Sequence, residues 1–183
     1  TIFHTLKDFE WTDEEFIKTR KIFADCREYD EMPSAPVNIY EVHLGSWKTH
    51  SDSTPFSYRE IADDLTEYVL EMGYTHIELM PVTEYPFDGS WGYQSTGFFS
   101  PTSRYGTANE LQELIDRLHN ARIGAILDFV PAHFALDGYA LRKYDGTELF
   151  EYPASDVSDS EWGSCNFIFA RREIACFMQS AAD

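Results

Sequence analysis

Residues 107–130 read TANELQELIDRLHNARIGAILDFV, a helical pattern followed directly by a strand pattern. Thr107 and Glu110 have the spacing of a capping box, which marks the start of a helix. Gly124 has the position of a helix stop. The apolar positions at helical spacing are Leu111, Leu114, Ile115 and Leu118. AILDFV (125–130) is apolar apart from one aspartate, as a strand covered on both faces should be. The stretch therefore predicts a helix and then a buried strand.

The same order of helix and strand occurs upstream of this stretch. SYREIADDLTEYVLEMG (57–73) predicts a helix, and THIELMPV (75–82) and VNIYEVHL (37–44) predict strands. The helix has Ser57 and Glu60 as its capping box, Gly73 as its stop, and Ile61, Leu65, Val69 and Met72 as its buried face. Alternating strands and helices indicate parallel βα units with right-handed crossovers. The predicted fold class is therefore α/β, with three parallel strands.

Two further helices are expected at the ends of the chain. TDEEFIKTRKIFADC has Thr12 and Glu15 at capping-box spacing, and the Pro-rich YDEMPSAP that follows reads as a linker. We therefore expect residues 1–36 to form an arm and residues 37–183 to form the main domain. The last helix is ARREIACFMQSAAD (170–183), with Ile174, Phe177 and Met178 as its inner face.

The composition argues against several classes of function. The chain has 32 acidic and 14 basic residues, and its net charge of −18 opposes binding to nucleic acid or to an anionic membrane surface. No run of about 20 apolar residues occurs, and the first residues lack a signal-peptide pattern. The first residue is not Met, so we expect that a segment has been removed upstream.

Cysteine and motif usage narrows the chemistry further. Three cysteines, with no C-x-x-C pair, favour a reduced cytoplasmic setting over a disulfide framework. The histidines lack close ligand spacing, so we expect no metal site. Walker A, G-x-G-x-x-G, H-E-x-x-H and G-x-S-x-G motifs do not occur, and we expect no cofactor.

The long connections of the chain follow predicted strands, whereas its helix-to-strand turns are minimal. These connections are residues 83–106 and 131–170, and both are rich in aromatic side chains. Ligands of parallel α/β folds gather at the carboxyl ends of the strands. We therefore expect the functional face there.

Four side chains at this face are candidates for binding. Asp128 lies near the end of the third strand, where a buried acid needs a hydrogen-bonding partner. A place in a polar pocket and a role in tying the next turn are equally supported for it, and a lone histidine such as His133 is more often structural. Trp91 and Tyr93 either stack on a ligand or pin their loop. Rings with a few placed polar groups suit a carbohydrate, whose C–H faces stack on aromatic side chains.

Three segments carry a resemblance to a known family. They are IYEVHLGSWK (39–48), ELMPVTEYPFDGSWGYQSTGFFSPTSRYGT (78–107) and GAILDFVPAHFALDGYALRKYDGTELFEY (124–152). Together they resemble the 1,4-α-glucan (glycogen) branching enzymes of the α-amylase superfamily, glycoside hydrolase family 13. KDFEWTDEEF resembles the segment that joins an N-terminal carbohydrate-binding module to the barrel in that family. The resemblance therefore implies that the arm (1–36) is a linker from such a module.

The resemblance implies a (β/α)8 TIM barrel, of which this chain would contain the first three βα units. It implies that Tyr93 stacks on the sugar in the cleavage subsite and that Asp128 and His133 hydrogen-bond that sugar. Trp91 and Gln94, which flank Tyr93 in SWGYQ (90–94), are further expected substrate-binding residues. In the family, the nucleophile and the acid/base are carboxylates of strands four and five. No catalytic residue is therefore assigned here, because Glu84, Asp88 and Asp137 have no motif around them.

Three hypotheses follow. The first hypothesis is that the chain is part of a glycogen branching enzyme, which transfers an α-1,4-glucan segment to a 6-hydroxyl and so forms α-1,6 branches. Under this hypothesis the fragment itself is expected to be inactive. The second is part of another α-amylase-superfamily hydrolase, and the third is a non-catalytic glucan-binding module. The second includes debranching and trehalose-forming hydrolases. The expected partner under the first hypothesis is α-1,4-glucan or glycogen. Because a three-stranded sheet has open edges, we also expect the isolated chain to be either self-associated or only marginally stable.

Overall fold

The computed structural model describes residues 8–25 and 36–183, which form two compact units. The first unit consists of the chain up to Met80 together with Ser103–Leu127. The second consists of Pro81–Thr102 and Asp128–Asp183. The predicted linker lies mostly outside the described residues, and so does Cys26. None of the helices in the described ranges is long and apolar enough to span a membrane.

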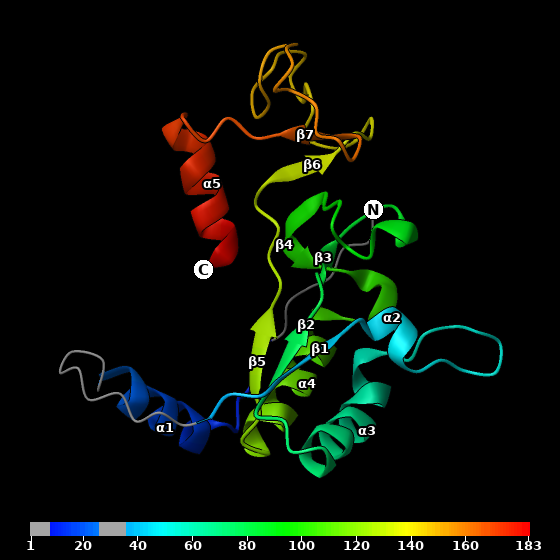
Figure 1. The fold of residues 1–183 in the computed structure, drawn as a ribbon, viewed down its shortest axis with the longest axis vertical. Coiled ribbons are helices and arrows are strands. Elements are labelled where there is room, and N and C mark those ends of the chain that lie inside the picture. Colours follow the sequence, from blue (N-terminus) through cyan, green and yellow to red (C-terminus); the bar gives the residue numbers. More distant parts are fainter. Residues whose placement is uncertain (1–7, 26–35) are drawn as a thin grey trace. The chain divides into compact units, whose positions relative to one another are not determined.

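The first unit is built on a parallel sheet. Its strands are β1 (Ile39–Val42), β2 (His76–Leu79) and β5 (Gly124–Leu127), in the order β1-β2-β5. The helices α3 (Tyr58–Glu71) and α4 (Ala108–Asn120) connect successive strands and pack against each other (Figure 1). This arrangement confirms the prediction of three parallel strands joined by helices. The unit also contains α1 (Glu14–Asp25), α2 (Leu44–Trp47) and the short 3₁₀ turn η3 (Ser103–Tyr105).

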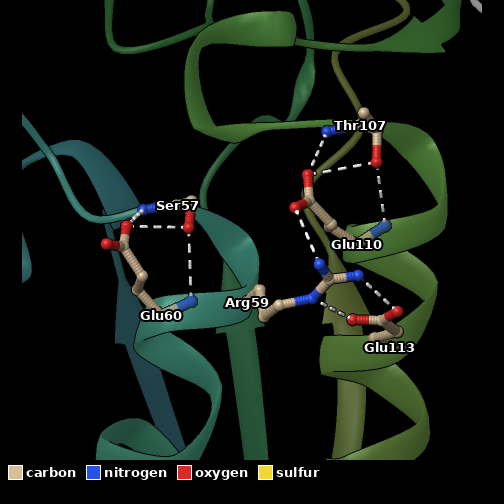
Figure 2. Close-up of polar contacts among 6 residues, drawn as sticks. All are labelled: Ser57, Arg59, Glu60, Thr107, Glu110 and Glu113. Carbon is tan, nitrogen blue, oxygen red and sulfur yellow. Dashed lines mark hydrogen bonds and ion pairs between the residues drawn. The ribbon is translucent and has the colours of Figure 1, made fainter.

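Both predicted capping boxes are present and begin the two connecting helices (Figure 2). The Ser57 backbone N–H donates to Glu60 Oε2 at 2.8 Å, and the Thr107 N–H donates to Glu110 Oε2 at 2.7 Å. In return, the hydroxyl of each cap accepts from the backbone N–H of its glutamate at 3.3 Å. Each helix therefore satisfies two orphan donors with its own side chains.

An arginine ties α3 to α4 near these caps. Arg59 donates through Nε and Nη2 to the two carboxylate oxygens of Glu113, both at 2.7 Å, and lies 3.7 Å from Glu110 (Figure 2). The hydrogen bonds from Arg59 lower the pKa of Glu113 from its usual 4.5. Stability from this pair is therefore present above that value and is lost as the pH falls through the lowered pKa.

Most of the predicted buried faces are correct. Five of the predicted side chains are 0% exposed: Ile61, Leu65, Val69, Leu114 and Leu118. Leu111 is also buried. Met72 is 54% exposed, so its assignment to the buried face was wrong. It lies beyond the last turn of α3, where the chain leaves the helix through Gly73 at φ +75°.

The prediction that Gly124 ends a helix was wrong. The helix α4 stops at Asn120, and Arg122 takes the left-handed backbone conformation at φ +63°. Gly124 is instead the first residue of β5, beside His76 of β2. A Cβ at Gly124 would lie 2.3 Å from the His76 ring, so a close approach between strands explains this glycine.

The third strand also differs from its prediction. It ends at Leu127, whereas the pattern predicted a strand over 125–130. Leu127 is 47% exposed, and Ala125 and Ile126 are half-buried. The strand is therefore not covered on both faces within the described residues, and Asp128 lies just outside it.

The predicted cap of the first helix was wrong as well. The helix begins at Glu14, and Thr12 donates its N–H and its hydroxyl to the Asp116 carboxylate of α4 at 2.8 and 2.7 Å. Asp13 pairs with His119 at 2.6 Å, and Phe16 stacks on the His119 ring with centroids 4.1 Å apart. A contact with α4, more than 100 residues away, thus replaces the local capping interaction.

The second unit contains two short antiparallel pairs that the sequence patterns did not indicate. Strand β3 (Thr83–Glu84) pairs with β4 (Gly97–Pro101), and β6 (His133–Ala135) pairs with β7 (Ser164–Asn166). The 3₁₀ turn η2 (Asp88–Ser90) and the helix α5 (Arg172–Ala182) complete it. Its apolar cluster contains Phe98, Phe134, Cys165, Phe167, Ile174 and Met178. The predicted inner face of α5 is confirmed, because Phe177 packs against this cluster too.

Replacing Thr107 by alanine is expected to lower the free energy of unfolding by about 1 kcal/mol, because the Glu110 N–H loses its acceptor at the helix start. Thr107→Ser keeps the hydroxyl and is the matched control, with a smaller expected loss. Urea denaturation followed by far-UV circular dichroism measures both. Equal losses for the two variants would contradict a capping role for the hydroxyl.

Candidate functional site

A left-handed turn presents Tyr93 in the second unit. Trp91 has φ +54° and Gly92 has φ +93°, and the Tyr93 N–H donates to the Ser90 carbonyl at 3.0 Å. A Cβ at position 92 would lie 2.4 Å from the backbone oxygen of Pro81. The turn therefore needs glycine at position 92 both for its backbone conformation and for space.

Two hydroxyls, one buried and one half-buried, support this turn. Ser95, 1% exposed, donates from Oγ to the Gly92 carbonyl at 3.2 Å. Its Oγ also lies 2.7 Å from Thr83 Oγ1 of β3. Since the single Ser95 proton is used on Gly92, the Thr83 hydroxyl donates to Ser95. The turn is thus connected to β3 by a chain of two hydrogen bonds.

Tyr93 itself is held at both ends. Its phenolic Oη donates to Asp128 Oδ2 at 2.7 Å, and its backbone carbonyl lies 2.8 Å from His133 Nε2. Because a carbonyl only accepts, His133 Nε2 carries the proton that is donated to Tyr93. Asp128 therefore has the hydrogen-bonding partner that a partly buried acid requires. Asp128 lies 35 positions after Tyr93 in the chain, and His133 lies 40 positions after it.

The β6–β7 hairpin positions His133. His133 is the first residue of β6 and pairs with Asn166 of β7. The next residue, Phe134, is 0% exposed and packs against Phe167 with ring centroids 4.8 Å apart. Because strand side chains alternate, burying Phe134 in the aromatic cluster turns His133 away from that cluster and toward the Tyr93 carbonyl.

Gln94 joins the same turn to a second loop. Its Nε2 donates to the carbonyl of Trp162 at 3.2 Å. Trp91, in the left-handed turn, is 57% exposed. The structure thus brings Tyr93, Asp128 and His133 into direct contact, places Trp91 and Gln94 on the same turn, and adds Ser95 and Trp162 to the set.

The sequence reasoning did not select Ser95 or Trp162. A buried serine has no distinctive pattern, because its role depends on a carbonyl and a hydroxyl brought to it by the fold. The sequence contains a weak indication of a role for Trp162. The stretch SEWGS (160–164) lies in the second aromatic loop and contains Ser, Trp and Gly in the same order as SWG (90–92).

Several other groups in the second unit have structural explanations. Burial raises the pKa of Cys165 to about 11, so its thiol stays neutral at physiological pH. The Glu84 carboxylate accepts from the Thr102 hydroxyl at 3.1 Å and from the Tyr85 N–H at 3.1 Å. Within the described ranges, no group of three or more His, Cys, Asp or Glu residues could hold a metal ion.

The arrangement around Tyr93 is suited to binding a neutral, hydroxyl-rich ligand. Its aromatic ring is fixed in place, a carboxylate lies at the ring's hydroxyl edge, and a second exposed ring belongs to the same turn. Carboxylates and amides orient sugar hydroxyls, and rings take the C–H faces. The first unit has a separate groove of about 490 Å³ beside α3 and α4, which none of the five predicted residues lines.

Comparisons with known proteins agree on one superfamily. The alpha-amylase catalytic-domain family matches residues 58–151, more than half of the chain. The 1,4-alpha-glucan branching enzyme GlgB of Fusobacterium nucleatum subsp. nucleatum is 47% identical over 172 residues, 94% of this chain and 27% of that protein. The GlgB of Nitrosospira multiformis is 51% identical over 150 residues, 81% of this chain and 20% of that protein.

Solved structures show the same fold. The crystal structure of an alpha-amylase from Geobacillus thermoleovorans, complexed with acarbose, aligns with a TM-score of 0.67 and 20% identity, over 80% of this chain and 36% of that chain. The predicted fold class, part of an α/β TIM barrel, is confirmed by this likeness and by the parallel β1-β2-β5 sheet. The chain spans 20–27% of the length of the branching enzymes cited above. It belongs to the alpha-amylase catalytic-domain family.

Proposed function

We propose that this chain is the substrate-binding part of a 1,4-α-glucan branching enzyme. Such an enzyme cleaves an α-1,4 bond, holds the glucan as a covalent glycosyl-enzyme and transfers it to a 6-hydroxyl. Support comes from relatives of that name that are 44–51% identical to most of this chain. The observation that carries the proposal is the Tyr93 hydroxyl bonded to Asp128, with His133 on the Tyr93 carbonyl.

In this proposal Tyr93 is the platform for one glucose unit. The apolar C–H face of the sugar stacks on the ring, and the Asp128 carboxylate accepts hydrogen bonds from sugar hydroxyls at the edge of the ring. Because the ring is already held before the glucan arrives, little side-chain freedom is lost on binding. The preset ring therefore contributes to transition-state positioning as well as to affinity.

His133, Trp91 and Gln94 complete the proposed surface. His133 donates to the Tyr93 backbone, so its effect on glucan binding passes through the position of that ring. Trp91, on the same turn, is 57% exposed and is proposed to contact the sugar chain. Gln94 fixes the neighbouring loop through the Trp162 carbonyl.

The bond-breaking carboxylates are proposed to come from outside residues 1–183. Retaining glycoside chemistry needs a nucleophile and a general acid about 5 Å apart. Glu84 is engaged with Thr102 and Tyr85, and it makes a poor substitute for either group. The isolated chain is therefore proposed to be inactive, to need no cofactor, and to bind α-1,4-glucan or glycogen.

A cytoplasmic location is part of the proposal. Cys165 is a free buried thiol and Cys176 is a free exposed thiol, a state that a reducing compartment maintains. The net charge of −18 further favours a neutral polymer over nucleic acid or a membrane as the partner.

Changing Asp128 to Ala in the complete protein is expected to remove most branching activity while leaving the fold intact. Loss of a positioning hydrogen bond at the reacting sugar costs about 2–4 kcal/mol of transition-state stabilisation. The measurement is the rate of new α-1,6 linkages formed from amylose. Asp156→Ala, an exposed carboxylate of the same unit, is the control and should retain the full rate.

Product analysis of the unchanged protein decides between the three hypotheses. New α-1,6 linkages support a branching enzyme. A net gain of reducing ends instead indicates a hydrolase of the same superfamily. Glucan binding without either product indicates a non-catalytic module. Near-normal turnover in Asp128→Ala would remove that residue from the proposed site.

Tyr93 and Asp128 should act as one unit in a double-mutant cycle. Tyr93→Phe keeps the stacking ring and loses only the bond to the carboxylate, so branching should fall less than in Tyr93→Ala. In an Asp128→Ala background, the same Tyr93→Phe change should have almost no effect. The coupling energy in kcat/KM is expected to be roughly 1.5–3 kcal/mol, the range for hydrogen bonds to charged groups. Additive losses would contradict the pairing.

The isolated 183-residue chain is expected either to self-associate or to be only marginally stable. Within the described residues, β1 and β5 pair on one side only, and Ile39 and Leu127 on these strands are 44% and 47% exposed. Open edges of this kind pair with other chains. Sedimentation velocity should show oligomers, and Leu127→Lys should reduce them. A monodisperse monomer that melts cooperatively would contradict the expectation.

A further inference from the structure

Trp162 is the most exposed large hydrophobic side chain among the described residues. It is 75% exposed, although tryptophan is highly buried on average. The residues on both sides of it, Glu161 and Gly163, are exposed too. Nearby Asp159 is exposed too, and it pairs with Arg142 at 3.7 Å. The net charge of −18 on the whole chain disfavours a membrane or a polyanion as the partner of this ring.

The backbone beneath this ring is well ordered by hydrogen bonds. The Ser160 N–H donates to the Ser164 carbonyl at 2.7 Å, and the Trp162 N–H donates to Ser160 Oγ at 3.2 Å. The Gly163 N–H donates to the Ser160 carbonyl at 3.1 Å, and Gly163 has φ +67°. A tight turn thus fixes the backbone that carries the exposed indole, so little backbone entropy is lost when a ligand covers the ring.

Two independent contacts tie this turn to the loop of Tyr93. Gln94 Nε2 donates to the Trp162 carbonyl at 3.2 Å. On the other side of the turn, Ser164 pairs with Ala135, whose N–H donates to the Ser95 carbonyl at 3.4 Å. The residues just after Tyr93 therefore position the turn that carries Trp162.

From this arrangement we propose that Trp162 is a second sugar-stacking platform, which takes another glucose unit of the α-1,4-glucan chain that Tyr93 binds. The inference deepens the proposed function and rests on it for the identity of the ligand. The indole is exposed, and hydrogen bonds connect its turn to the loop of Tyr93. A glucan chain presents an apolar C–H face on each sugar, so a second ring can stack on another unit of the same chain. The net charge of −18 favours a neutral glucan over a polyanion as the partner.

Direct binding is tested on the complete protein labelled with 5-fluorotryptophan. The fluorine-19 resonance of Trp162 is identified as the one missing in Trp162→Phe. Titration with maltoheptaose should shift this resonance saturably, whereas the resonance of Trp11, in the first unit, should stay in place. A Trp162 resonance that does not respond to maltoheptaose would overturn the inference.

Kinetics provide the second readout. Trp162→Ala should raise KM for amylose roughly twofold to tenfold, the range expected for one ring-stacking contact, with kcat changed less than about twofold. Trp162→Phe should restore most of the affinity because it keeps an aromatic face. Tyr144→Ala removes a ring of the same unit that is 74% exposed, and it should leave both constants unchanged. Thermal melting of each variant verifies that the fold is kept.

The outcomes separate this inference from the proposed function. If Asp128→Ala abolishes branching while Trp162→Ala leaves KM unchanged, the stacking role is wrong and the branching proposal stands. If no α-1,6 linkages form but maltoheptaose shifts the Trp162 resonance, the branching proposal is wrong and Trp162 remains a glucan-binding residue. Equal rises of KM in Trp162→Ala and Tyr144→Ala would also overturn the inference, because they would show a nonspecific effect of removing surface rings.

Discussion

The hydrogen bonds at the two ends of Tyr93 are the constraint on which the candidate site depends. The Asp128 carboxylate holds the phenolic hydroxyl, and His133 holds the backbone carbonyl. A tyrosine fixed only at its backbone could still rotate about χ1 and χ2. With both ends bonded, the ring has one defined position, and a ligand that stacks on it meets a preorganised surface.

Each of these bonds relies on a different part of the second unit. The carbonyl of Tyr93 points where it does because Trp91 and Gly92 take left-handed conformations, and Gly92 has no side chain to strike Pro81. His133 has its orientation because Phe134, the next residue, is buried against Phe167. Polar groups of the site are thus positioned by apolar packing one residue away, as strand alternation requires.

Local sequence patterns predicted the regular elements of the first unit well. The two capping boxes and the leucine-rich faces act within three or four residues of one helix, so their effect is visible in the sequence. The errors arose where a distant segment replaced a local interaction. Thr12 bonds to Asp116 instead of capping α1, and Gly124 makes room for His76 instead of ending α4.

The short strands of the second unit were missed for a related reason. Pairs such as β6 with β7 involve three residues each, too few to show an alternating pattern, and they form because the aromatic cluster of Phe98, Phe134 and Phe167 brings them together. Their stability comes from side chains far apart in sequence rather than from propensity within the strand.

The sequence by itself determined the α/β class, the order of the three parallel strands and their connecting helices, the caps of α3 and α4, and the aromatic and acidic residue types available for binding a sugar. Each of these depends on residues that are neighbours in the chain. The tertiary structure alone decided that Tyr93 meets Asp128, that His133 acts on the Tyr93 backbone, and that Gln94 reaches Trp162 across 68 positions. Such contacts form only when folding brings distant segments together, since the loop-closure entropy they cost is offset by the packing of the whole unit.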